Sequence, residues 1–362
     1  MAETLHLDAS RAVRPGEELD LPALTAHLQA HLDGLAGPLV VEQFPSGHSN
    51  LTYLLRAGDR ELVLRRPPFG TRVKTAHDMG REHRILAGLC RVYPKAPRPL
   101  LYCADPAVIG APFYLMERVR GVILRGRQPK AAAGLAPAAV RRLCEALVDG
   151  LAELHAVDVA AAGLADVGHP EGYVRRQVEG WTRRYFDAKT DEVPALEAAA
   201  AWLPCHLPPE SGAAIIHNDY KYYNVVLDPD DLTRVVAVLD WEMASVGDPL
   251  MDLGTSLGYW VDPDDSPEHR MLPFGPTTLP GNLTRAEVVV RYTERSGRDV
   301  RGVLFYYVFA LLKVATIAQQ IYQRFVEGHT KDPRFAAMIF GVRILGATAA
   351  RALELGRIDR LG

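Results

Sequence analysis

Residues 217–224 read HNDYKYYN, and no other segment of this chain carries as much chemical information. His217, Asp219, Lys221 and Asn224 follow one another there at offsets of two, two and three. A short loop can direct the last three side chains into one cleft while His217 supports the backbone. Transfer of a phosphoryl group needs a carboxylate beside the attacking hydroxyl, a cation near the γ-phosphate and an oxygen ligand on the metal. The segment contains all three.

The residues after this loop predict a hairpin. Residues 225–227 are Val-Val-Leu and favour a strand, 228–231 favour a turn, and 234–239 favour a returning strand. Such a hairpin brings Asp240 back beside Asn224. Mg²⁺ takes oxygen ligands from one or two carboxylates together with substrate phosphates, so this pair could hold it. Taken alone, each Asp reads better as a turn or strand-end residue; the order of the polar residues along the chain, followed by a hairpin and an Asp, favours the metal site.

Three segments together carry a family resemblance: residues 217–224, 239–242 (LDWE) and 247–253 (GDPLMDL). They resemble the aminoglycoside phosphotransferase and choline kinase family, and more narrowly the kinase domain of acyl-CoA dehydrogenase family members 10 and 11 and of stand-alone bacterial relatives. The similarity extends from about residue 40 to about residue 350. It implies an α+β, two-lobed protein-kinase-like fold, and transfer of phosphate from ATP to a small molecule with Mg²⁺ as cofactor.

Length and composition agree with such an enzyme. The 362 residues exceed the usual size of one hydrophobic core. We expect a nucleotide-binding lobe at 1–117, with a leading helix at 21–34, and a catalytic and substrate-binding lobe at 118–362. The net charge of -3 argues against nucleic-acid binding. Scattered cysteines and a polar N-terminus predict a cytoplasmic protein. The apolar run 303–312 ends at Lys313 and is too short to span a membrane, so we expect it to belong to a buried helix.

The first lobe should contain strands at 39–44, 51–56 and 61–65. The turn between the first two lies where a kinase covers the nucleotide phosphates, and its small residues would let backbone N–H groups approach phosphate oxygens. Any tight hairpin could look similar. The candidate phosphate-binding residues in this turn are Ser46, Gly47, His48, Ser49 and Asn50.

Arg65 ends the third strand, where kinases usually carry a lysine. A guanidinium group can grip phosphate with two hydrogen bonds, so Arg65 could serve the same purpose. Its neighbour Arg66 should point to the opposite face and to solvent. The family pattern pairs Arg65 with Glu82, on a helix that Thr75 and Asp78 would cap. The alternative is that Glu82 simply reaches solvent at the edge of an apolar face.

Two more strands, at 100–103 and 113–119, should lead into the hinge between the lobes. By resemblance, Met116, Glu117 and Val119 fall where adenine binds through backbone groups. The second lobe should be mainly helical, at 141–155, 173–188, 193–202, 285–296, 301–327 and 332–355. We expect His155 beneath the catalytic loop, and Asp248 or Asp252 accepting hydrogen bonds from that loop.

The irregular segment 259–280 lies where relatives build the substrate pocket. The sequence predicts a kinase that moves the γ-phosphate of ATP to a hydroxyl of a small molecule, with no nucleic-acid or membrane partner. One candidate acceptor is a hydroxyacyl-CoA, for which a basic surface could be supplied by Arg65, Arg66, Arg72, Lys74 and Arg81. The alternative reading of these residues is a solvated charge run. Other acceptors (an aminoglycoside, choline or an amino alcohol) and a nucleotide-binding pseudokinase stay open.

Overall fold

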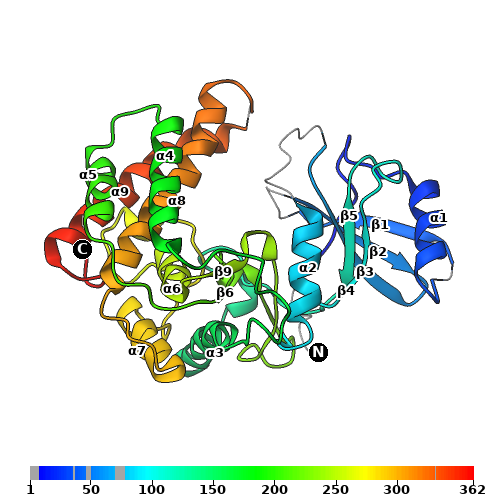
Figure 1. Cartoon of the computed structure of the whole chain (residues 1–362), viewed down its shortest axis with the longest axis horizontal. Helices are drawn as coiled ribbons and strands as arrows, with labels where there is room; N and C mark the ends of the chain where they lie inside the picture. The colour runs from blue at the N-terminus through cyan, green and yellow to red at the C-terminus, as the bar shows by residue number, and fades with distance from the viewer. Residues whose placement is uncertain (1–7, 36, 46–49, 70–77, 331) are drawn as a thin grey trace. The chain divides into compact units, whose positions relative to one another are not determined.

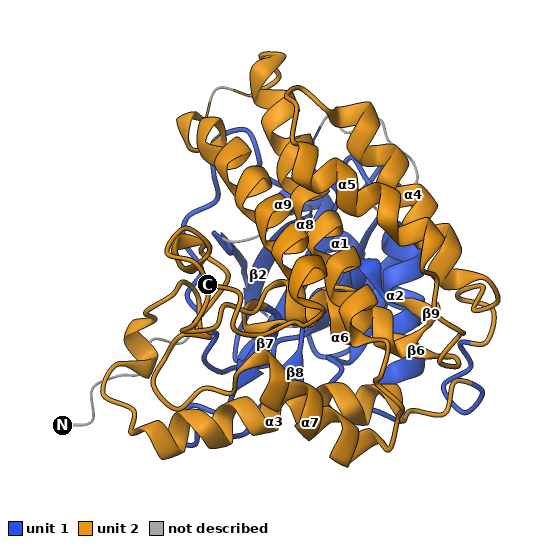
Figure 2. Ribbon diagram, turned by 90° about the vertical axis from the view of Figure 1, so that its left-hand side faces the viewer, with its two compact units in different colours: residues 1–123, 160–164, 224–244 blue, residues 124–159, 165–223, 245–362 orange. Residues whose placement is uncertain are grey.

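The computed structural model describes residues 8–362 other than 36, 46–49, 70–77 and 331. The chain forms two compact units, coloured separately in Figure 2. Unit 1 comprises Met1–Ile123, Ala160–Leu164 and Asn224–Ala244, and unit 2 comprises Leu124–Val159, Ala165–Tyr223 and Ser245–Gly362. The lobe boundary expected between residues 117 and 118 stays a prediction.

Unit 1 is built on a five-stranded antiparallel sheet in the order β1-β2-β3-β5-β4 (Figure 1). Its strands are β1 (Leu39–Gln43), β2 (Leu51–Ala57), β3 (Arg60–Arg66), β4 (Pro99–Cys103) and β5 (Phe113–Glu117). Alternate residues of β2 and β3, among them Tyr53 and Leu64, pack with Leu24 and Leu28 of helix α1 (Leu21–His31) in one apolar core. The antiparallel sheet expected from the resemblance is confirmed.

Helix α2 (Met79–Leu89) covers the other face of this sheet (Figure 1). Asp78 is its N-cap residue and accepts a hydrogen bond from the amide of Arg81 at 2.9 Å. The sequence interpretation had placed Asp78 at the end of a capping box begun by Thr75; Asp78 caps the helix itself, and Thr75 lies outside the described residues. A carboxylate at the N-cap satisfies an amide that the helix leaves without a partner.

The predicted hairpin is present in unit 1. Strand β7 (Val225–Leu227) pairs antiparallel with β8 (Val235–Val238), and the amide of Leu239 donates to the carbonyl of Asn224 at 2.8 Å. Val122, which follows β5 in the chain, forms an isolated β-bridge to Leu227 of β7 and so links this segment to the hairpin. Asn224 and Asp240 therefore stand at the open end of one hairpin.

Unit 2 is mainly helical. Its α-helices are α3 (Pro137–His155), α4 (Tyr173–Ala188), α5 (Pro194–Trp202), α6 (Pro249–Gly258), α7 (Arg285–Ser296), α8 (Val303–Val326) and α9 (Met338–Leu355). A two-stranded ladder joins β6 (Ala214–Ile216) to β9 (Ser245–Gly247). Short 3₁₀ helices are η1 (Lys130–Ala132), η2 (Leu203–Cys205), η3 (Tyr222–Asn224), η4 (Trp241–Met243), η5 (His269–Met271) and η6 (Pro333–Ala337).

Helix α8 passes through the interior of unit 2, as its apolar sequence predicted. The apolar run ends at Lys313 as expected, and the helix itself continues to Val326, 24 residues in all. By length and composition alone, α8 and the segment Pro333–Leu355 could cross a bilayer. Most of α8 is buried among the other helices of its unit, and core helices pass the same test.

Candidate active site

The loop 217–223 lies in unit 2 and is held by helix α6. Both oxygens of Asp252, in the first turn of that helix, accept backbone hydrogen bonds: from the amide of His217 at 2.6 Å and from that of Asn218 at 2.7 Å. The amide of Asp219 donates to Nδ1 of His217 at 3.2 Å. The expected contact between Asp252 and the loop backbone is confirmed, and His217 contacts the backbone beside Asp219.

Asp252 is completely buried and belongs to a polar chain that crosses unit 2. Nε2 of His155 lies 3.1 Å from its carboxylate, and Nδ1 of His155 lies 2.7 Å from the Tyr292 hydroxyl. Burial works against the charge of Asp252, but His155 and the loop amides outweigh it and lower the pKa of this carboxyl below its ordinary value. His155 thus lies beneath the loop, as predicted, and helps to keep the Asp252 carboxylate ionised.

Asp219, Lys221 and Tyr259 form a cluster in the same unit. Nζ of Lys221 lies 2.7 Å from Oδ1 of Asp219 and 4.2 Å from the centroid of the Tyr259 ring. The Tyr259 hydroxyl is hydrogen-bonded to the Asp219 carboxylate, and burial raises its pKa well above the usual range. Tyr259 therefore stays a hydrogen-bond donor at neutral pH and directs Asp219 together with Lys221.

A separate cluster of charged residues lies in unit 1, at the open end of the β7–β8 hairpin. Asp240 has a left-handed backbone (φ 68°), and its side chain is partly exposed. Nη2 of Arg65 lies 2.9 Å from Oδ1 of Asp240, and Nη1 lies 3.1 Å from Oε1 of Glu82. Burial opposes the positive charge of Arg65, but Glu82 and the neighbouring carboxylates raise its pKa well above the ordinary value. Arg65 is permanently charged, and its predicted partner Glu82 is confirmed.

Asn50 extends this network. Its Nδ2 donates to Oε2 of Glu242 at 2.7 Å, and the same oxygen lies 3.5 Å from Nη2 of Arg65. The other four turn residues proposed to contact phosphate, Ser46, Gly47, His48 and Ser49, lie outside the described residues. At the hinge, Met116 is buried in β5 opposite Val63. Glu117 pairs with Arg98, and Val119 packs on the hairpin core.

The basic surface suggested for a CoA acceptor is not formed by its described members. The guanidinium group of Arg65 forms ion pairs with carboxylates of unit 1. Arg66, expected in solvent, is buried, donates to the carbonyl of Ile109 at 2.8 Å and lies 3.6 Å from the Phe69 ring centroid. Arg81 donates to the carbonyls of Glu242 and Ala244. Arg72 and Lys74 lie outside the described residues.

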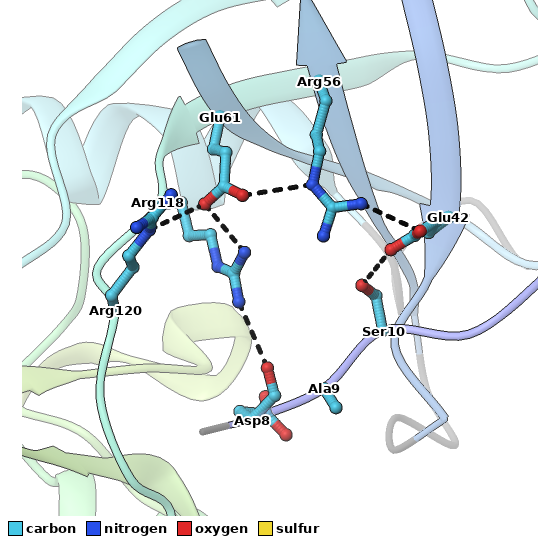
Figure 3. Close-up of a pocket in the computed structure, with 8 residues that line it drawn as sticks. All are labelled: Asp8, Ala9, Ser10, Glu42, Arg56, Glu61, Arg118 and Arg120. Atoms are coloured by element: carbon cyan, nitrogen blue, oxygen red, sulfur yellow. Dashed lines mark hydrogen bonds and ion pairs between the residues drawn. The ribbon is translucent and has the colours of Figure 1, made fainter. Parts of the chain in front are cut away.

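Unit 1 contains another group of arginines around a cavity of about 440 Å³ (Figure 3). Glu61 accepts from Arg56 at 3.1 Å, from Arg118 at 2.7 Å and from Arg120 at 2.9 Å. Arg56 also lies 2.8 Å from Glu42. The cavity is lined by Asp8, Ala9, Ser10, Glu42, Arg56, Glu61, Arg118 and Arg120. Its opposite charges compensate each other, which disfavours it as an anion site.

Comparison with known proteins agrees with this geometry. A model of the phosphotransferase enzyme family matches residues 40–285. The chain belongs to this family. It is 35% identical over 333 residues to mouse acyl-CoA dehydrogenase family member 10, covering 91% of this chain and 31% of that protein. Human acyl-CoA dehydrogenase family member 11 is 33% identical over 329 residues, covering 88% and 41%. The chain spans less than half the length of these two relatives.

Among solved structures, one from Ralstonia eutropha described as an aminoglycoside phosphotransferase is 31% identical, with a TM-score of 0.79, and covers 93% of this chain and 99% of that one. A type I macrolide 2'-phosphotransferase shares the fold at a TM-score of 0.58 and 21% identity. The protein-kinase-like fold is therefore confirmed for this member of the phosphotransferase family.

Two residues beside the loop 217–223 were not recognised as candidate site residues from the sequence. Tyr259 had been read only as the start of an irregular segment. Lys313 had been noted only as the end of an apolar run, but its ammonium group is buried and donates to the carbonyl of Asn218 at 2.7 Å. The one available signal was a lysine inside a long apolar helix, since a buried charge needs a partner.

Proposed function

We propose that the protein transfers the γ-phosphate of ATP to a hydroxyl group of a small molecule. The main support is the cluster at Asp219, whose carboxylate is directed by Lys221 and Tyr259 on a loop clamped by Asp252. A carboxylate held this way can orient a hydroxyl group and accept its proton. Lys221 would offset charge on the phosphoryl group in transit, and His217 would keep the backbone before Asp219 in place.

The nucleotide would bind to unit 1. Arg65, oriented by Glu82, would hold phosphate oxygens. The turn residues Ser46, Gly47, His48, Ser49 and Asn50 would cover the phosphates, and Met116, Glu117 and Val119 would border adenine. The 2.9 Å ion pair between Arg65 and Asp240 supports this assignment, because it joins the phosphate-binding cation to the carboxylate intended for the metal.

Asn224 and Asp240 fit a magnesium ion. Both are oxygen donors at the end of one hairpin, and Asp240 is partly exposed, so it can reach a phosphate-bound ion. When bound, Mg²⁺ would neutralise charge on the nucleotide phosphates. No metal-binding group of three or more His, Cys, Asp or Glu occurs among the described residues. A site of one carboxylate and one amide, completed by phosphates and water, does not require such a group.

For the acceptor, we propose a hydroxyacyl-CoA. The support is similarity to proteins named acyl-CoA dehydrogenase family members 10 and 11. Transfer to such a hydroxyl would form a phosphate monoester and ADP, and the hydroxyl proton would pass to Asp219. The product would carry a good leaving group in place of a poor one. The arginines described in unit 1 do not form the expected basic surface, so the CoA phosphates would need other contacts.

An aminoglycoside is the second candidate acceptor, favoured by similarity to the Ralstonia eutropha structure. A pseudokinase is less well supported: its one argument is the lysine-to-arginine exchange at Arg65, and Arg65 keeps the pairing with Glu82 that the family pattern implies.

The decisive experiment measures ADP release with MgATP and a panel containing 3-hydroxybutyryl-CoA, longer hydroxyacyl-CoAs, kanamycin and choline, followed by detection of the phosphorylated product. We expect turnover with a hydroxyacyl-CoA. Asp219→Asn should lower kcat by at least ~10²-fold and leave ATP binding almost unchanged, because the carboxylate addresses the acceptor. Turnover of kanamycin or choline alone would move the protein to the other acceptor class, and near-normal kcat in Asp219→Asn would contradict the role of this residue.

A further inference from the structure

Lys313 is a buried charge in the middle of the apolar helix α8. Only 2% of the residue is exposed. Its Nζ lies 2.7 Å from the carbonyl oxygen of Asn218, 3.4 Å from Oγ1 of Thr255 and 5.7 Å from the centroid of the Trp181 ring. Burying an ammonium group costs much free energy unless the group is paired and hydrogen-bonded. These contacts all lie within unit 2.

The partner of this ammonium group is an unusual piece of backbone. Asn218 has a left-handed conformation (φ 64°), which is uncommon for residues other than glycine. Its amide is held by Asp252 at 2.7 Å and its side-chain Nδ2 by the Tyr173 hydroxyl at 3.1 Å. Its carbonyl belongs to the peptide unit that continues into Asp219. Lys313 thus holds the carbonyl group of the peptide that joins Asn218 to Asp219.

We propose that Lys313 is a positioning residue for phosphoryl transfer: its ammonium group fixes the peptide between Asn218 and Asp219 and so sets the direction of the Asp219 carboxylate. This inference rests on the proposed function, because it concerns how Asp219 is presented to the acceptor. It adds a long-range contact from α8 to the local clamp that α6 provides through Asp252.

Because Lys313 is charged, its contact with the carbonyl of Asn218 should depend on pH. Burial lowers the pKa of Lys313 to about 8, while Asp219 and Asp252 act in the opposite direction. Lys221 on the loop and Arg184 on α4 lower it further. Above about pH 8 the ammonium group loses its proton and holds the carbonyl less strongly, so kcat should fall as pH rises through this value.

Gln319 provides a matched control on the same helix. It is buried, and its Nε2 donates to the carbonyl of Ala188 at 2.9 Å and to Thr190 at 2.8 Å, away from the loop. Lys313→Met and Gln319→Met both remove a buried donor to a backbone carbonyl. Peptide-level hydrogen exchange at pH 7 should be faster over residues 214–224 in Lys313→Met by roughly 10-fold or more, the size expected for loss of a charged donor. Gln319→Met should leave this segment protected.

Turnover supplies the second readout, with MgATP and the hydroxyacyl-CoA proposed as acceptor. Lys313→Met should reduce kcat by roughly 10-fold or more, keep the KM for ATP nearly constant and lose the alkaline decrease near pH 8. Equal exchange over 214–224 in both variants, or an unchanged pH profile in Lys313→Met, would overturn the proposal. Absence of ADP release from the wild type with every acceptor tested would count against the proposed function, while the exchange data would still decide whether Lys313 holds the loop.

If Lys313→Met does not fold, the wild type provides the test. Exchange over 217–224 is then compared at pH 7 and pH 9 with exchange over 183–190, the segment that Gln319 holds. The ratio corrects for the intrinsic effect of pH on exchange. Loss of relative protection over 217–224 at pH 9 would support the proposal, and a constant ratio would refute it.

Discussion

At the residue scale, Arg65 pairs with several carboxylates at once. It joins Glu82, Asp240 and Glu242 inside unit 1, where a lysine could offer only a single point of charge. A planar guanidinium group can hold Glu82 with one nitrogen and Asp240 with the other. The exchange of lysine for arginine therefore fits a site in which the cation also orders the carboxylates around it.

This arrangement leads to a prediction for Arg65 variants. Arg65→Ala should weaken ATP binding far more than adenosine binding, because adenosine offers no phosphate to the guanidinium group. Arg65→Lys should keep part of the affinity as a point charge. Isothermal titration calorimetry with both ligands separates the effects. Equal losses for ATP and adenosine would mean that Arg65 mainly stabilises unit 1, where its removal leaves Glu82 buried without its cation.

At the element scale, α6 serves as the support of the catalytic loop. Its first turn places Asp248 at the N-cap and Asp252 one turn further on, and the two carboxylates have different partners. Asp248 accepts from the amide of Leu250 and from Ser211, whereas Asp252 accepts from the amides of the loop. Of these two carboxylates, four residues apart in the sequence, Asp248 caps the helix and Asp252 holds the loop.

Asp252→Asn tests this division. It replaces one acceptor oxygen by a donor facing the amide of His217 or Asn218, and should lower the free energy of unfolding by about 3 kcal/mol. Turnover should fall by at least ~10-fold, because the loop loses its register. Asp248→Asn is the control, since Asp248 accepts from Leu250 and Ser211 and not from the loop amides. Chemical denaturation and kcat measure the two effects; similar losses in both variants would contradict a special role for Asp252.

The difference in stability between the wild type and Asp252→Asn should depend on pH. The folded pKa of Asp252 is lowered from 3.8, so its charge adds stability that is fully present above pH 3.8 and is lost as pH falls through the folded pKa. The stability advantage of wild type over Asp252→Asn should therefore shrink in urea titrations performed progressively below pH 3.8. An advantage that grows with acidity would show the opposite sign and exclude this linkage.

At the scale of the whole molecule, the chain passes repeatedly between the two units. Unit 1 takes its hairpin from residues 224–244, which follow the catalytic loop of unit 2 directly, and a short piece from residues 160–164. Gly88 of α2 shows how closely that short piece is packed: a Cβ there would lie 2.5 Å from the carbonyl of Ala162. Neither unit can be formed from one continuous stretch of chain.

We therefore expect both units to unfold in one transition. Trp241 reports on unit 1, while Trp181, Trp202 and Trp260 report on unit 2. Within each of two variants, one that keeps Trp241 alone and one that lacks only Trp241, the urea midpoint by fluorescence should equal the midpoint by far-ultraviolet circular dichroism. Separate midpoints within one variant would reveal independent stability of the units and contradict this expectation.

Much of this protein follows from local sequence. The helices at 173–188 and 285–296, the hairpin after the loop and the adjacency of Asn224 to Asp240 come from periodicity, turn residues and short spacing, which act between near neighbours. The order of polar groups in 217–224 was equally visible. Interactions of this kind depend on a few consecutive residues, so they can be predicted before any packing is known.

Tertiary structure alone decided which distant groups meet. Lys313 lies 95 residues from Asn218, and Asn50 lies 192 residues from Glu242. Arg66 was expected in solvent because strand alternation assigns a face but does not say what covers that face; the carbonyl of Ile109 and the ring of Phe69 do so. Tyr259 joined the site in the same way. Such contacts depend on how whole elements pack, and the burial and charge that result are properties of the folded chain.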